Sequence, residues 1–247
     1  GAHGYLVAQF LSPLSNKRDD DWGGDPARRM RFLLEVVRRI RARVSPGFAV
    51  GLKLNSADFQ RGGFTEDESR GVLAALAGEG LDLIEVSGGS YEQPAMMGAA
   101  SERTRSREAY FLEYARTVRS IVGDIPLAVT GGLRSRSSMQ AAVDSGECDI
   151  VGLGRPTATT PDAADAILSG RTATFDSLQI HFVMRSVLGK LTDLKALDGF
   201  LDITWHADQL HRLGAGRQPD LDQGRIATTI SMLRRNGRAS FGRKRGL

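Results

Sequence analysis

The feature that most constrains the fold of this chain is a regular alternation of helix-like and strand-like segments between Asp25 and Gly170. The helix-like segments place apolar residues on one face at helical spacing, whereas the strand-like segments are short apolar runs. Complete strands are predicted at residues 48–54, 81–86, 126–129 and 149–153. Apolar strands separated by helices predict a parallel sheet, so the expected fold class is α/β.

The helix boundaries carry local signals of their own. Asp25 followed by Pro26 is typical of an N-cap and a first helical turn. The segment Thr65–Glu68 has the pattern of a capping box. Helices are predicted at residues 26–44, 65–80, 107–122, 135–146 and 161–168, with further helical segments at 186–197 and 202–213.

Two arrangements of strands fit this alternation. A closed (β/α)₈ TIM barrel needs eight strands, so four strands would form about half of one. The pattern favours this C-terminal part of a barrel, and an open doubly wound sheet is the alternative. We expect a partial barrel at residues 1–170, a helical extension at 171–233 and a basic, disordered tail at 234–247.

Two predicted strands end abruptly in glycine. Thr130–Gly131–Gly132 follows one strand, and Gly152–Leu153–Gly154–Arg155 ends the next. In (β/α)₈ barrels the loops after the last two strands commonly bind phosphate through backbone N–H groups. Glycine allows close approach of the main chain, and the Arg155 guanidinium adds charged donors. The sequence therefore predicts an anion site at Gly131, Gly132, Gly154 and Arg155, for a cofactor or for a phosphorylated substrate.

The charge distribution argues against nucleic acid as a partner. The formal net charge is +4, but the last fourteen residues hold six basic residues and no acid. No aromatic residues alternate with these basic residues beyond Phe241. We also find no apolar stretch of membrane-spanning length and no signal segment, so a cytoplasmic protein without a membrane partner is expected.

Cysteine and histidine usage points away from metal and disulfide chemistry. Cys148 is the sole cysteine, so it cannot form an intrachain disulfide, and its apolar surroundings predict a buried side chain. His206 and His211 have the spacing of a metal-binding pair, with His181 upstream. No acid or cysteine is placed to complete such a site, so no metal is expected.

Five separated groups of residues carry a resemblance to a known family. They are Ala2–His3–Gly4–Tyr5–Leu6 with Gln9–Pro13 and Trp22–Gly23–Gly24, then Lys53–Leu54–Asn55–Ser56, Val86–Ser87–Gly88–Gly89, Thr130–Gly131–Gly132 and Gly154–Arg155–Pro156. In this order and at these spacings, residues 1–170 resemble the old yellow enzyme family of flavin-dependent ene reductases.

The resemblance implies an activity and a role for individual residues. Members are FMN-containing (β/α)₈ barrels in which NAD(P)H reduces the flavin, which then passes hydride to an activated alkene. His3 matches the second member of the pair that holds the substrate carbonyl, and Tyr5 matches the proton donor. Lys53 resembles the basic residue beside the flavin pyrimidine ring, and Ser87 and Gly88 are expected to line the same cleft.

The resemblance thus predicts an FMN-dependent NAD(P)H oxidoreductase that reduces C=C bonds of enone- or enal-type small molecules. The first histidine of the carbonyl-binding pair and the first half of the barrel are absent from this sequence, which matches the C-terminal portion of the family. The alternative is a catalytically silent, flavin- or phosphate-binding half-barrel that acts through association. A homo-oligomer is compatible with either, and Tyr91–Glu92–Gln93–Pro94 is a candidate substrate-facing segment.

Overall fold

A computed structural model describes residues 1–88, 111–176, 178 and 194–237. These residues belong to two compact units. The first unit contains residues 1–88, 111–133 and 137–152, and the second contains residues 134–136 and the described residues from 153 onward. The candidate segment at residues 91–94 lies outside the described residues, as does the chain after residue 237.

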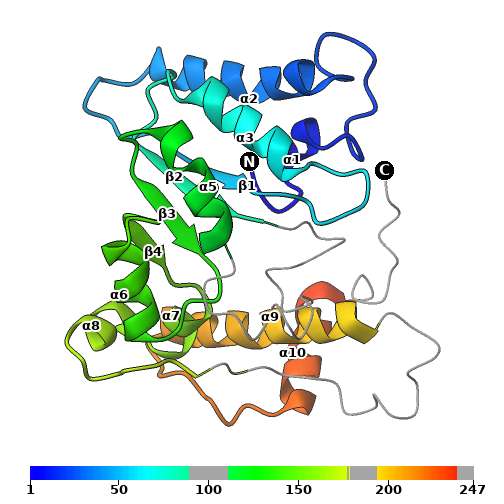
Figure 1. Ribbon diagram of the computed structural model, residues 1–247. Coiled ribbons are helices and arrows are strands. Elements are labelled where there is room, and N and C mark those ends of the chain that lie inside the picture. Colours follow the sequence, from blue (N-terminus) through cyan, green and yellow to red (C-terminus); the bar gives the residue numbers. More distant parts are fainter. Residues whose placement is uncertain (89–110, 177, 179–193, 238–247) are drawn as a thin grey trace. The chain divides into compact units, whose positions relative to one another are not determined.

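In the first unit, helices and strands alternate along the chain as predicted (Figure 1). Its elements are α1 (Leu6–Leu11), α2 (Pro26–Arg41), β1 (Gly51–Asn55), α3 (Glu66–Leu76), β2 (Leu83–Ser87), α5 (Leu112–Val122), β3 (Leu127–Thr130), α6 (Arg136–Asp144) and β4 (Ile150–Gly152). The four predicted strands are confirmed, with limits that differ by a few residues.

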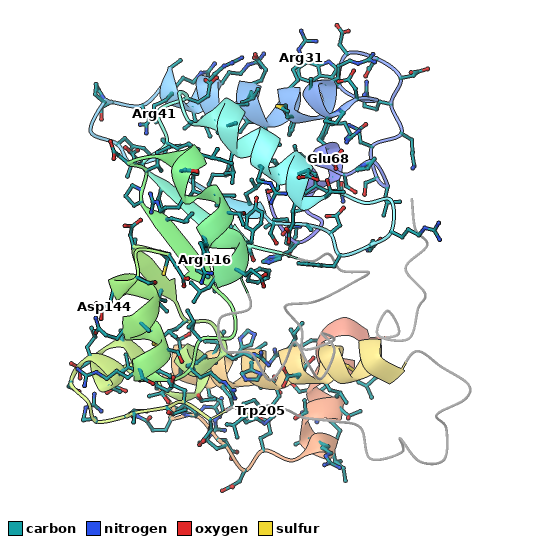
Figure 2. The ribbon with its side chains drawn as sticks, viewed as in Figure 1. Arg31, Arg41, Glu68, Arg116, Asp144 and Trp205 are labelled. Atoms are coloured by element: carbon teal, nitrogen blue, oxygen red, sulfur yellow. The ribbon has the colours of Figure 1, made fainter. Side chains whose placement is uncertain are left out.

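Both predicted helix caps are confirmed. The Asp25 side chain accepts a hydrogen bond from the backbone N–H of Arg28 at the start of α2. At the start of α3, Thr65 and Glu68 form a reciprocal capping box. Glu68, labelled in Figure 2, also pairs with the buried Arg29 of α2. The residues that begin α3 therefore also fix it against α2.

The four strands form one parallel sheet in the order β1-β2-β3-β4. A doubly wound sheet would reverse its strand order at a switch point and carry helices on both faces. Here the order follows the sequence without a reversal, as it does in a barrel. The expected α/β class with four parallel strands is confirmed, and the strand order favours the barrel arrangement over the doubly wound one.

The two faces of the sheet differ in chemistry because successive strand residues point to opposite sides. One face contributes Leu54, Ile84, Val86, Leu127 and Val129 to a core shared with α2, α3 and α5. The buried Cys148 belongs to the same core, as expected. The other face carries a set of polar side chains, which are Lys53, Asn55, Glu85, Ser87 and Thr130.

The second unit is helical. Its elements are α7 (Arg155–Thr159), α8 (Ala163–Leu168), α9 (Leu194–Gly214) and α10 (Arg225–Asn236). The predicted helix at 202–213 is the later part of the longer α9, in which Trp205 is buried (Figure 2). Arg235, assigned to the tail on sequence grounds, lies in α10 and pairs with Asp208 of α9.

The described helices include none that combines the length and the apolar character needed to cross a membrane.

Candidate active site

His3 lies in the turn that precedes α1, and two bonds hold it against the polar face of the sheet. Its backbone N–H donates to Asn55 Oδ1 over 3.2 Å. Its imidazole Nε2 lies 2.8 Å from the hydroxyl oxygen of Ser87, 84 positions later in the chain. His3 has a φ of 60°, a left-handed conformation that is uncommon outside glycine. Such strained backbone conformations cluster at functional sites.

The surroundings of His3 favour the uncharged imidazole. Burial, followed by the nearby Lys53 ammonium, lowers the pKa of His3, and Glu85 opposes this shift. A histidine with a lowered pKa is neutral at physiological pH, with one ring nitrogen donating and the other accepting. The geometry thus presents His3 as a neutral hydrogen-bonding group.

Tyr5 is the N-cap residue of α1, two positions after His3. The residue is 61% exposed. The short spacing places both predicted catalytic residues next to the start of α1.

Lys53 is held by an acid on the neighbouring strand. Its ammonium donates to Glu85 Oε1 over 2.6 Å, and the parallel register places the two residues side by side on β1 and β2. Burial alone would raise the pKa of Glu85, but hydrogen bonds from Lys53 and Thr130 outweigh it and lower the pKa. Sequence analysis missed Glu85, although an acid within the apolar strand Leu83–Ser87 was a usable signal.

Gly88 is buried, and its lack of a side chain allows aromatic rings to pack directly against its backbone. A Cβ atom there would lie 2.7 Å from the rings of Phe59 and Phe111. Gly131 and Gly132, directly after β3, both have positive φ values of 139° and 84°. These two residues therefore adopt a backbone conformation that favours glycine.

In the second unit, Arg155 begins α7 directly after Gly154. A Cβ atom at Gly154 would meet no other atom within 4 Å, so its backbone is open. Arg155 Nη1 lies 3.4 Å from Asp202 Oδ2 on α9, and the Asp202 side chain is only 9% exposed. The His206 ring nitrogen Nδ1 lies 2.8 Å from the Asp202 carbonyl oxygen. Sequence analysis did not identify Asp202, which is 47 positions from its partner.

The structure brings His3, Lys53 and Ser87 together in the first unit, where Gly131 and Gly132 follow β3. Gly154 and Arg155 belong to the second unit, so the two predicted parts of the phosphate cradle are described separately. Within the described ranges, no cluster of three or more His, Cys, Asp or Glu side chains could hold a metal ion.

Residues 1–174 match the family model described as the NADH:flavin oxidoreductase / NADH oxidase family. The chain belongs to this family. The match covers all the predicted site residues, and it confirms the expected membership of a family of NADH:flavin oxidoreductases.

Several curated relatives in the NADH:flavin oxidoreductase family are similar to the chain. The NADH-dependent flavin oxidoreductase iccE of Talaromyces variabilis is 34% identical over 86% of this chain and 53% of its own length. The NADH-dependent flavin oxidoreductase iliE of Neonectria sp. is 41% identical over 70% of this chain and 24% of its own length. The chain therefore spans about half, or less, of the length of these relatives.

Solved structures give the same family context. A 2-naphthoyl-CoA reductase complex is similar with a TM-score of 0.61 and 29% identity, over 67% of this chain and 25% of that one. Morphinone reductase is similar with a TM-score of 0.51 and 26% identity, over 70% and 43% of the two chains. An old yellow enzyme homologue from Zymomonas mobilis shares the fold, with a TM-score of 0.53, 21% identity and coverage of 72% and 47%.

Proposed function

We propose that this chain supplies the FMN-phosphate and substrate-binding part of an NAD(P)H-dependent flavin oxidoreductase that reduces activated C=C bonds of α,β-unsaturated carbonyl compounds. The observation that carries the proposal is the His3 imidazole, 2.8 Å from the Ser87 hydroxyl and close to the Lys53 ammonium on the polar face of the sheet. Membership of the NADH:flavin oxidoreductase family supports it.

The donor set suits an anionic flavin mononucleotide. Lys53 offers a fixed cation, which near the pyrimidine ring would favour negative charge on the reduced ring. Gly131 and Gly132 adopt positive-φ backbone conformations that few residues other than glycine adopt. The Arg155 side chain is 41% exposed and offers charged donors for a phosphate. When bound, FMN supplies hydride transfer from NAD(P)H to the alkene.

The residues around the substrate carbonyl have separate roles in this proposal. The Ser87 hydroxyl donates to His3 Nε2, which keeps the ring proton on Nδ1. Nδ1–H then donates to the carbonyl oxygen and stabilises the negative charge that develops there during reduction. The Tyr5 phenol, in the same turn, donates a proton to the alkene carbon.

The sharpest test of these roles separates the two half-reactions. In the Tyr5→Phe variant, reduction of the flavin by NAD(P)H stays at the wild-type rate, and reoxidation by 2-cyclohexenone slows about 100-fold, because only the second step needs the proton. Stopped-flow absorbance of the flavin measures both steps. Tyr114→Phe is the matched control, since Tyr114 is buried and bonded to Ser69.

Two outcomes contradict the proposal. A purified protein that stays colourless and takes up no FMN would favour a silent half-barrel. Equal loss in both half-reactions for Tyr5→Phe would remove the proton-donor role from Tyr5.

A further inference from the structure

A row of side chains crosses the polar face of the sheet from strand to strand. Lys53 on β1 pairs in register with Glu85 on β2. Glu85 pairs in register with Ala128 on β3, so Thr130, two residues later, lies on the same face. Thr130 in turn pairs with Gly152 on β4. Each of the four strands thus contributes one position to this row.

The contacts along this row are close and specific. Lys53 Nζ lies 2.6 Å from Glu85 Oε1, and Thr130 hydrogen-bonds the same carboxylate. A Cβ atom at Gly152 would lie 1.8 Å from Thr130 Oγ1. The Thr130 hydroxyl therefore occupies the space that the absent side chain of Gly152 leaves free. Gly152 on β4 thus leaves space for Thr130, and Thr130 hydrogen-bonds Glu85, which in turn pairs with Lys53.

We propose that Glu85 is a positioning residue for Lys53, and that Thr130, in the space left by Gly152, positions the Glu85 carboxylate. Together these groups set the electrostatic potential at His3. This inference rests on the proposed function in assigning Lys53 to the flavin ring. The charge balance at His3 is independent of that assignment.

The geometry favours this role over that of an ordinary surface ion pair. The Lys53 and Glu85 side chains are 35% and 28% exposed, so both are substantially shielded from water. Some ion pairs elsewhere in the first unit are more exposed at both ends, as for Arg28 and Asp25 at 46% and 49%. A free lysine side chain loses much rotamer freedom on binding, and an acid that already holds it reduces that cost. Glu85 therefore fixes the cation before any ligand arrives.

The first experiment measures FMN binding in variants of Glu85. Glu85→Gln keeps an oxygen that accepts from Lys53, so the FMN dissociation constant stays within about threefold of wild type. Glu85→Ala releases the ammonium and weakens FMN binding about tenfold. Glu79→Gln, the same change in the pair that Glu79 forms with Arg38 of α2, leaves binding unchanged. Wild-type affinity in Glu85→Ala would overturn the positioning role.

The second experiment needs no flavin. The charged side chains that face His3 are Lys53 and Glu85. An NMR titration of the His3 ring should show a lower pKa in Glu85→Gln, which removes the negative charge, and a higher pKa in Lys53→Met. An unchanged His3 pKa in both variants would show that Lys53 and Glu85 do not set the electrostatic potential at His3. A protein that binds no FMN but shows these shifts contradicts the proposed function alone.

A conservative pair of variants separates the hydroxyl of Thr130 from its shape. Thr130→Val removes the hydrogen bond to Glu85 and is expected to weaken FMN binding severalfold. Thr130→Ser keeps the hydroxyl and restores wild-type affinity. Equal affinities for the two variants would show that Thr130 does not seat Glu85.

Discussion

Lys53 and Arg155, the two cations that we assign to the flavin, are held in different ways. Lys53 meets Glu85 at 2.6 Å within the sheet, on adjacent strands and in register. Arg155 lies 3.4 Å from Asp202, a buried acid on a helix that follows the repeated strands and helices. The lysine is therefore part of a close charge pair, whereas the arginine keeps a looser contact and is more exposed.

This difference suits the two roles proposed for the cations. A flavin ring system needs a cation at a fixed place beside it, which a close pair within a rigid sheet provides. A phosphate needs donors that can turn toward it, and a half-exposed guanidinium with one long contact keeps most of its five N–H groups available. We infer that the sheet fixes the ring end, and that α9 orients the arginine without neutralising it.

The strongest test of this comparison replaces each cation in turn. Arg155→Ala is expected to weaken FMN binding about 100-fold, because it removes charged donors to the phosphate. Lys53→Met is expected to weaken it about tenfold, since its charge is already partly balanced by Glu85. Titration of FMN into the apoprotein measures both. Arg171→Ala is the control, because Arg171 forms exposed ion pairs with Asp162 and Asp165, and this variant should bind FMN as wild type does. A larger loss for Lys53→Met would reverse the comparison.

A second test addresses the close packing of Gly152 against Thr130. Gly152→Ala is expected to reduce the free energy of unfolding by about 2 kcal/mol, because its Cβ would overlap Thr130. Urea unfolding followed by circular dichroism measures the loss. Adding Thr130→Ala relieves the worst contact and recovers part of the stability. Gly71→Ala in α3 is the matched control, since its Cβ would meet no atom within 4 Å, and it should be neutral or stabilising. Equal effects at Gly152 and Gly71 would contradict the close packing.

The smallest expected effect is the pH dependence of the Lys53–Glu85 pair. Because the fold lowers the pKa of Glu85 below its ordinary value of 4.5, the ionised acid stabilises the folded protein above that pH. The advantage of wild type over Glu85→Gln is below about 1 kcal/mol at pH 7, since both groups are partly exposed. It should shrink as the pH falls below 4.5 and disappear in a Lys53→Met background. An advantage that grows on acidification would show that the pKa is raised.

Local chemistry in the sequence was enough to predict the four strands and the starts of α2, α3, α6 and α8. Asp25 and Thr65 cap their helices as expected, since a cap depends on residues only a few positions apart. The apolar runs before Gly88 and Gly131 are strands, as expected, because strands buried in a parallel sheet need mainly apolar side chains. The short helix α7 was not predicted, because five residues carry too little periodic signal.

The partners of the site residues were beyond sequence reasoning. The bond between His3 and Ser87 joins positions 84 residues apart, and only the folded sheet brings them together. Asp202 meets Arg155 through α9, which lies outside the repeating pattern that guided the prediction. The roles of Tyr5 and of the glycines came from family resemblance, and they stay predictions until the variants above are measured.

The contrast between the two sheet faces also restricts how this chain can change in length. Side chains along a strand alternate with a period of two, so deleting or inserting one residue in β2 would exchange its faces. Glu85 would then enter the apolar core, and Ile84 or Val86 would take its place next to Lys53. Substitution of a residue between Leu83 and Ser87 should therefore disturb the fold less than the gain or loss of one residue there.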